Sequence, residues 1–140
     1  MKDYMKLALK ASELSPDNRT KVGACIANLE TGEIVSTGCN TMPNNCKDFT
    51  WELGEGLNNK HLYVAHAELN AILTARRDLT GLALFTTLFP CNECAKAIIQ
   101  SGISHVFYIS DKYKDVLAFQ ASRLMLNKSG IKLEEVVVEC

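Results

Sequence analysis

Three side chains that commonly bind transition metals occur in two short segments that are far apart in the sequence. His66 is followed two positions later by Glu68, and Cys91 and Cys94 form a C-x-x-C pair directly after Pro90. One imidazole and two thiolates are typical zinc ligands, and one ion can bind them only if the chain brings both segments together. This requirement constrains the fold more than any other feature of the sequence.

The number of ligands indicates what such a zinc ion would do. Three protein ligands leave one tetrahedral position open, which is typical of catalytic zinc. Glu68, two residues from His66, could then move protons for a water molecule at that position. Cys39 or Cys46 could instead provide a fourth ligand, and spacing alone does not exclude this. A lone C-x-x-C pair also occurs in redox proteins and in half of a structural zinc site, but no second pair is present to complete one.

Length, composition and charge exclude several classes of protein. The 140 residues predict a single domain over residues 1–140. Hydrophobic residues make up 47% of the chain and charged residues 22%, as in globular proteins with a hydrophobic core. The formal net charge of −1 argues against a nucleic-acid partner, because such a partner requires a basic face. No apolar run is long enough to cross a bilayer, so we expect no membrane contact.

The N-terminal residues and the cysteines together indicate a cellular location. The start of the chain lacks the charged and then apolar pattern of a signal peptide, so we expect a cytoplasmic protein. In that compartment the six cysteines would remain reduced and would not form a disulfide framework. Cys25 and Cys140 are interpreted as small buried or loop thiols.

Apolar periodicity and turn residues predict an alternating α/β chain. Helices are predicted over residues 2–14, 66–77, 91–101 and 115–128, and strands over residues 22–27, 34–38, 82–89, 105–110 and 132–138. Leu69, Ile72 and Leu73 are expected on the inner face of the helix over residues 66–77. A polar loop over residues 40–60 is long enough to be functional or mobile. The alternation after the first hairpin predicts one mixed sheet with helices on its faces.

The predicted elements place the metal ligands at the starts of two helices. His66 and Glu68 would lie in the first turn of one helix, and Cys91 and Cys94 in the first turn of another, each after a strand end. The three-residue spacing puts both sulfur atoms on one helical face. Helix N-termini carry partial positive charge, which favours the thiolates that zinc requires. The ends of strands are also where α/β sheets bind ligands.

These segments match a known signature. A His-x-Glu segment followed by Pro-Cys-x-x-Cys is typical of zinc-dependent nucleobase deaminases. The segments H-A-E-L-N-A-I (66–72), L-F-P-C-N-E-C-A-K (88–96), S-D-K-Y (110–113) and T-K-V-G-A-C-I (20–26) strongly resemble the deoxycytidylate (dCMP) deaminases of the cytidine/deoxycytidylate deaminase family. The resemblance extends from the first predicted helix to about Ile131.

The resemblance implies a fold, a reaction and an assembly. The fold would be the cytidine-deaminase-like three-layer α/β/α fold with a mixed five-stranded sheet. The reaction would convert dCMP to dUMP and ammonia, which supplies dUMP for thymidylate synthesis. It also implies a homo-oligomer, often a hexamer. Many members of the family are activated by dCTP with Mg²⁺ and inhibited by dTTP.

The resemblance also implies how the metal site would work. His66, Cys91 and Cys94 match the ligands of one catalytic Zn²⁺ per chain, and Glu68 matches the proton shuttle. Zinc lowers the pKa of a bound water molecule from 15.7 to roughly 7, so that hydroxide forms at neutral pH. That hydroxide would attack C4 of the pyrimidine, while Glu68 carries the proton to the ring nitrogen and assists the departure of ammonia.

Four residues are candidates for binding the substrate. Asn40 matches a residue that contacts the sugar, and Arg19 matches an arginine that contacts the phosphate in many bacterial relatives. A guanidinium and a phosphate form strong paired hydrogen bonds. Tyr113 is a second phosphate candidate, and Ala67, between His66 and Glu68, is the fourth candidate for substrate binding. Alternatively, Arg19 is a solvated loop charge and Tyr113 packs its ring on the core.

One loop departs from the family pattern. It reads Gly38-Cys39-Asn40-Thr41, whereas the family usually has Gly-Tyr-Asn-Gly at these positions. In the regulated enzymes this loop is linked to effector binding. The departure therefore argues against control of this chain by dCTP and dTTP.

Three other functions are consistent with parts of the sequence. The same zinc site could serve a deaminase of dCTP, CMP or free (deoxy)cytidine. A deaminase that edits RNA or DNA would need a basic surface with interspersed aromatic residues, which the near-neutral charge does not favour. A zinc-stabilised interaction module without catalysis would have no need for Glu68 or for an open coordination position.

Overall fold

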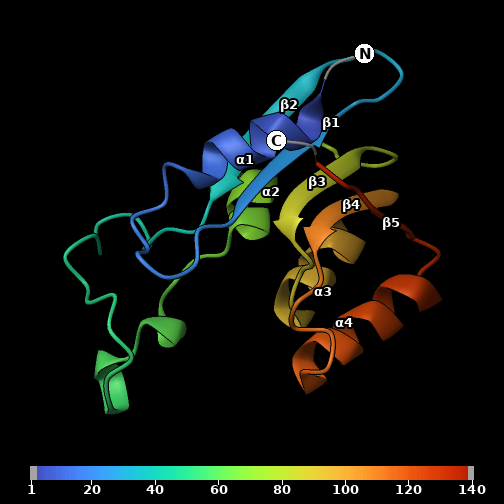
Figure 1. The fold of residues 1–140 in the computed structure, drawn as a ribbon. Coiled ribbons are helices and arrows are strands. Elements are labelled where there is room, and N and C mark those ends of the chain that lie inside the picture. The colour runs from blue at the N-terminus through green and yellow to red at the C-terminus, as the bar shows by residue number, and fades with distance from the viewer. Residues whose placement is uncertain (1–2, 139–140) are drawn as a thin grey trace.

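A five-stranded mixed sheet forms the centre of the computed structural model, which describes residues 3–138 (Figure 1). The strands are β1 (Gly23–Ala27), β2 (Ile34–Cys39), β3 (Ala83–Leu88), β4 (His105–Ser110) and β5 (Lys132–Glu135). They lie in the order β2-β1-β3-β4-β5. Strand β1 pairs antiparallel with β2 and β3, whereas β3, β4 and β5 are parallel. The predicted mixed five-stranded sheet is confirmed.

Helices cover both faces of this sheet. They are α1 (Tyr4–Ser12), α2 (Ala67–Ala75), α3 (Asn92–Ser101) and α4 (Leu117–Lys128). Helix α1 packs on one face, and α2, α3 and α4 belong to the layer on the other face (Figure 1). The chain therefore has the three-layer α/β/α arrangement that the family resemblance implied. None of the helices in the described residues is long and apolar enough to span a bilayer.

Alternating side chains divide the core between the two faces of the sheet. Ile26, Leu84 and Val106 are buried on the face covered by α2, α3 and α4. Phe85 and Phe107 point to the other face, where their rings stack with centroids 4.4 Å apart. Cys25 lies fully buried on this second face, in agreement with its interpretation as a structural thiol, and burial raises its pKa to about 11. Cys140 lies outside the described residues.

Helix α2 presents only part of its predicted inner face to the sheet: Ile72 packs against the core as predicted, whereas Leu73 does not. The prediction that Leu73 faces inward is wrong, because its side chain is 63% exposed. The buried side instead carries Ala67 and Ala71, which lie against β2. The reason is a close backbone approach at Gly38, where an added Cβ would lie 2.7 Å from both the Ala67 carbonyl oxygen and the Ala71 amide nitrogen. Small residues permit this contact, and a leucine there would not fit.

Several predicted boundaries differ from the observed ones by a few residues. The first helix begins at Tyr4, and residue 2 of its predicted range lies outside the described residues. Strand β5 ends at Glu135, three residues before its predicted end. The predicted loop over residues 40–60 contains the short 3-10 helix η1 (Gly56–Asn58), and a second one, η2 (Lys60–Leu62), follows it. Helix α3 ends as predicted at Gly102, whose φ of 87° suits glycine.

Candidate active site

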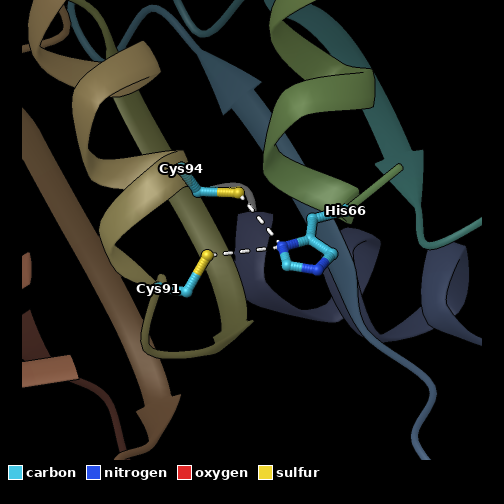
Figure 2. Close-up of side chains that lie close together, drawn as sticks. All are labelled: His66, Cys91 and Cys94. Atoms are coloured by element: carbon cyan, nitrogen blue, oxygen red, sulfur yellow. Dashed lines mark hydrogen bonds between the residues drawn. The ribbon is translucent and has the colours of Figure 1, made fainter. Parts of the chain in front are cut away.

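The two ligand segments meet at the starts of α2 and α3. His66 is the N-cap residue of α2, Cys91 is the N-cap residue of α3, and Cys94 lies in the first turn of α3. Figure 2 shows the His66 ring pointing from the start of α2 toward both sulfur atoms. Both helix N-termini therefore direct their partial positive charge at the cluster, as the sequence predicted.

The spacing of the three ligand atoms fits a tetrahedral zinc ion. The His66 Nδ1 atom lies 3.4 Å from the Cys91 Sγ atom and 3.4 Å from the Cys94 Sγ atom. Zinc bonds of about 2.0–2.1 Å to nitrogen and about 2.3 Å to sulfur, at the tetrahedral angle, separate these atoms by about 3.5 Å. The metal-binding cluster within residues 3–138 comprises these three side chains and includes neither Cys39 nor Cys46. Three protein ligands leave one coordination position for a water molecule.

The cluster also favours a negative charge on sulfur. A hydrogen bond from the Cys94 thiol, assisted by His66 and opposed by burial, lowers the pKa of Cys91 to about 4. The same hydrogen bond, together with burial, raises the pKa of Cys94. One thiolate is thus present at neutral pH, and a divalent cation would displace the proton that the second sulfur retains.

Glu68 is a buried carboxyl group in the first turn of α2. Its side chain is 4% exposed, and burial raises its pKa to about 7. A cation bound beside it would favour the ionised form and lower that pKa. A carboxyl group that can exchange protons near neutral pH is suited to general acid–base catalysis.

A cavity of about 450 Å³ opens beside this cluster. Its lining includes His66, Cys91 and Glu68, so two of the metal ligands and the carboxyl group share one compartment. This volume is within the range of typical small-molecule sites. The compartment could hold a nucleotide base next to the metal position.

Three of the four predicted substrate-binding residues line the cavity. They are Asn40, Ala67 and Tyr113. Arg19 is exposed and does not belong to the lining, whereas its neighbour Thr20 does. The phosphate-binding role of Arg19 stays a prediction, and it requires the guanidinium to reach the cavity from its rim.

Asn40 connects two segments of the cavity wall. Its side chain is buried, and its Oδ1 atom accepts a hydrogen bond of 2.9 Å from the Val22 amide. Its Nδ2 atom donates to the Thr20 carbonyl oxygen at 2.8 Å. The side chain therefore fixes the segment before β1 against the loop after β2, and the second proton on Nδ2 is left for another acceptor.

Sequence reasoning missed two charged residues in the cavity lining. Asp17 and Lys60 both line it and form an ion pair with 2.8 Å between Lys60 Nζ and Asp17 Oδ2. Each residue lies in a polar segment without a motif, where a charge is normally solvated. Only their contact in space distinguishes them, and a single sequence carries no signal of that contact.

Helix α4 supports the turn that carries Cys91. The Ser122 Oγ atom donates a buried hydrogen bond of 2.8 Å to the carbonyl oxygen of Pro90. The Arg123 guanidinium lies 4.4 Å from the centroid of the Phe89 ring and forms an ion pair with Asp111. These contacts hold the residues on the N-terminal side of Cys91 in place and so orient a metal ligand.

Replacement of Ser122 tests this support. Ser122→Ala removes the hydrogen bond to the buried Pro90 carbonyl, and an unpaired buried acceptor costs about 1–3 kcal/mol. We expect urea denaturation of the zinc-loaded protein to show a loss of that size. Ser129→Ala, at the exposed end of α4, should change the unfolding free energy by less than about 0.5 kcal/mol. Equal effects of the two substitutions would contradict the role of Ser122.

Comparisons with known proteins agree with this geometry. Residues 1–110 match the family model described as the cytidine and deoxycytidylate deaminase zinc-binding region. Deoxycytidylate deaminase from Homo sapiens is 42% identical over 142 residues, which cover 98% of this chain and 79% of that protein. The probable deoxycytidylate deaminase from Drosophila melanogaster is 45% identical over 139 residues, covering 92% and 68% of the two chains.

A solved structure with the same fold gives a third comparison. It is the dCMP deaminase from the cyanophage S-TIM5 in complex with dCMP and dUMP. The two structures superpose with a TM-score of 0.75 and 30% sequence identity, over 95% of this chain and 93% of that chain.

Proposed function

This chain belongs to the cytidine and deoxycytidylate deaminase family, and from that premise we propose that it converts dCMP and water to dUMP and ammonia. The observation that carries the proposal is one cavity whose lining includes His66 and Cys91 of the metal-binding cluster together with the buried Glu68. The identity to deoxycytidylate deaminases and the likeness to a structure bound to dCMP and dUMP support this choice of substrate.

The chemistry follows from the residues around the cavity. His66, Cys91 and Cys94 would hold a zinc ion, which when bound supplies a Lewis acid that activates a water molecule for attack. Glu68 accepts the proton that the water loses on adding to C4, and delivers it to the ring nitrogen N3. The same carboxyl group then assists transfer of a proton to the departing amino group, which leaves as ammonia.

A phosphate contact would select the monophosphate. We propose that Arg19 binds the phosphate of dCMP, supported by its position next to the cavity-lining Thr20. A hydrogen bond to a charged group contributes about 1.5–3 kcal/mol, so Arg19→Ala should raise the KM for dCMP by about 10- to 100-fold. The kcat/KM for deoxycytidine, which lacks the phosphate, should stay unchanged. Steady-state kinetics with both substrates check this, and an unchanged KM for dCMP would remove Arg19 from the phosphate site.

Substrate choice is tested by ammonia release from dCMP, CMP, dCTP and deoxycytidine. We expect dCMP to have the highest kcat/KM of the four. A clear preference for another compound in the panel would identify a related deaminase on the same metal site. No ammonia from any of them would leave the zinc-stabilised interaction module as the better account.

Two further proposals rest on the family resemblance: a homohexamer, and activation by dCTP with Mg²⁺ opposed by dTTP. Two others rest on the sequence itself: a single domain over residues 1–140 and a cytoplasmic location. Light scattering on the purified protein measures the assembly. Adding dCTP with Mg²⁺, or dTTP, to the dCMP assay measures the regulation. Cys39 and Thr41, which differ from the residues usual in the family's effector loop, argue against it.

A further inference from the structure

A buried ion pair outside the metal cluster lies in the wall of the cavity. The Asp17 and Lys60 side chains are each 6% exposed, and Lys60 Nζ donates to Asp17 Oδ2 at 2.8 Å. The two residues are 43 positions apart. Asp17 lies in the segment between α1 and β1, and Lys60 is the first residue of η2. Buried lysine and aspartate are rare unless paired, so this pair is a specific feature of the fold.

Asp17 organises the turn that leads into β1. Its Oδ1 atom accepts hydrogen bonds from the amides of Arg19, at 2.8 Å, and Thr20, at 3.4 Å, while Oδ2 faces Lys60. Burial acts to raise the pKa of Asp17, but the hydrogen bond from Lys60 and those from the two amides lower it below its ordinary value. The carboxylate therefore stays ionised and connects the backbone of the 17–20 turn to the Lys60 ammonium.

Lys60 organises the segment over residues 52–64 in the same way. Its amide donates to the Glu52 carbonyl oxygen at 3.0 Å, and its carbonyl oxygen accepts from the amides of Tyr63 and Val64, both at 3.0 Å. Val64 and the neighbouring His61 line the cavity. The Lys60 side chain thus joins the folded part of the 52–64 loop to Asp17, with the cavity bounded by both segments.

Burial of this pair does not suit a role in stability alone. Apolar residues of similar volume often stabilise a protein as well as a buried ion pair does, because both charges lose their hydration. A buried pair does, however, fix the relative position of the two groups that it joins. Here the pair joins the turn at residues 17–20 to the segment over residues 52–64, and both segments contribute residues to the cavity lining.

We propose that Asp17 and Lys60 are positioning residues. Their ion pair fixes the position of the 17–20 turn relative to the 52–64 loop across the cavity, and so sets the affinity for the nucleotide. The inference rests on the proposed dCMP activity. Neither residue takes part in proton transfer, which Glu68 performs. Loss of the pair should therefore weaken substrate binding while the chemical step is preserved.

Steady-state kinetics of the zinc-loaded protein test the proposal. Lys60→Met removes the charge and keeps the length of the side chain, and Asp17→Asn keeps an acceptor for the Arg19 amide. Both should raise the KM for dCMP by at least about tenfold and change kcat by less than about threefold, with zinc content unchanged. The matched control is Arg77→Met, which breaks the exposed Arg77–Glu33 pair, 2.9 Å long and away from the cavity, and should leave both constants unchanged.

Hydrogen exchange gives a readout that does not depend on turnover. Lys60 reaches the Arg19 and Thr20 amides through Asp17, so Lys60→Met should accelerate amide exchange there as well as at Tyr63 and Val64. Exchange within α3 should stay unchanged. A substitution that only disturbed local packing would affect the 60–64 region alone.

The outcomes separate this inference from the proposed function. An unchanged KM in both variants, a fall in kcat without a change in KM, or an equal effect of Arg77→Met would overturn the positioning role. If Lys60→Met does not fold, the KM of Asp17→Asn decides. If the wild-type protein releases no ammonia from dCMP, the proposed function fails, and the exchange at Arg19 and Thr20 still decides whether the pair couples the two segments.

Discussion

Glu68→Gln should leave zinc bound at one ion per chain and lower kcat for dCMP by about 10²–10⁴-fold, the range that general acid–base catalysis contributes. Glutamine has the shape of glutamate and can hydrogen-bond, but it cannot accept and return a proton. Glu68 is buried in the cavity lining, and its raised pKa of about 7 suits proton exchange near neutral pH. Zinc content by elemental analysis and the initial rate of ammonia release give the two readings.

A matched control exists on the neighbouring helix. Glu93 lies in the first turn of α3, next to the cysteine ligands, but it is exposed and pairs with Lys96. Glu93→Gln should keep wild-type kcat and zinc content. If Glu68→Gln retained wild-type turnover, or if Glu93→Gln lost it to the same extent, proton transfer would have to be assigned elsewhere.

Cys94→Ser should release zinc and abolish turnover. Losing a hydrogen-bonding partner of a metal ligand costs about 10–100-fold in affinity, and losing the ligand itself should cost more. Serine is not ionised at neutral pH, so it cannot replace the thiolate. We expect competition with a chromogenic chelator to show a fall in zinc affinity beyond that range.

Two other cysteines provide the control for this substitution. Cys39 is the last residue of β2 and Cys46 lies in the loop after it; both are free thiols and do not belong to the cluster. Cys39→Ser and Cys46→Ser should keep one zinc ion per chain. Loss of zinc from either variant would mean that a fourth protein ligand closes the coordination sphere, and the site would then be structural.

The elements of the fold were predictable because their signals are local. Proline and glycine mark where helices and strands end, and the alternation of strands with helices implies the sheet. Strand β4 was predicted with both of its observed ends, and the ligands lie at the starts of α2 and α3 as their spacing required.

The details that depend on tertiary contacts were not predictable in the same way. Leu73 has the periodicity of a core residue, yet it faces outward because Gly38 brings β2 against the small residues of α2. The Asp17–Lys60 pair depends on two polar segments that meet only in the folded chain. The family resemblance pointed to Arg19, but it could not state that this side chain lies outside the cavity lining.

One zinc titration tests the central claim most directly. The protein is stripped with a chelator, and ammonia release from dCMP is followed as zinc is added back in fractions of one equivalent per chain. Our account predicts no turnover without zinc and a linear recovery that reaches its maximum at one equivalent. Undiminished turnover by the stripped protein, or none after a full equivalent has bound, would contradict it.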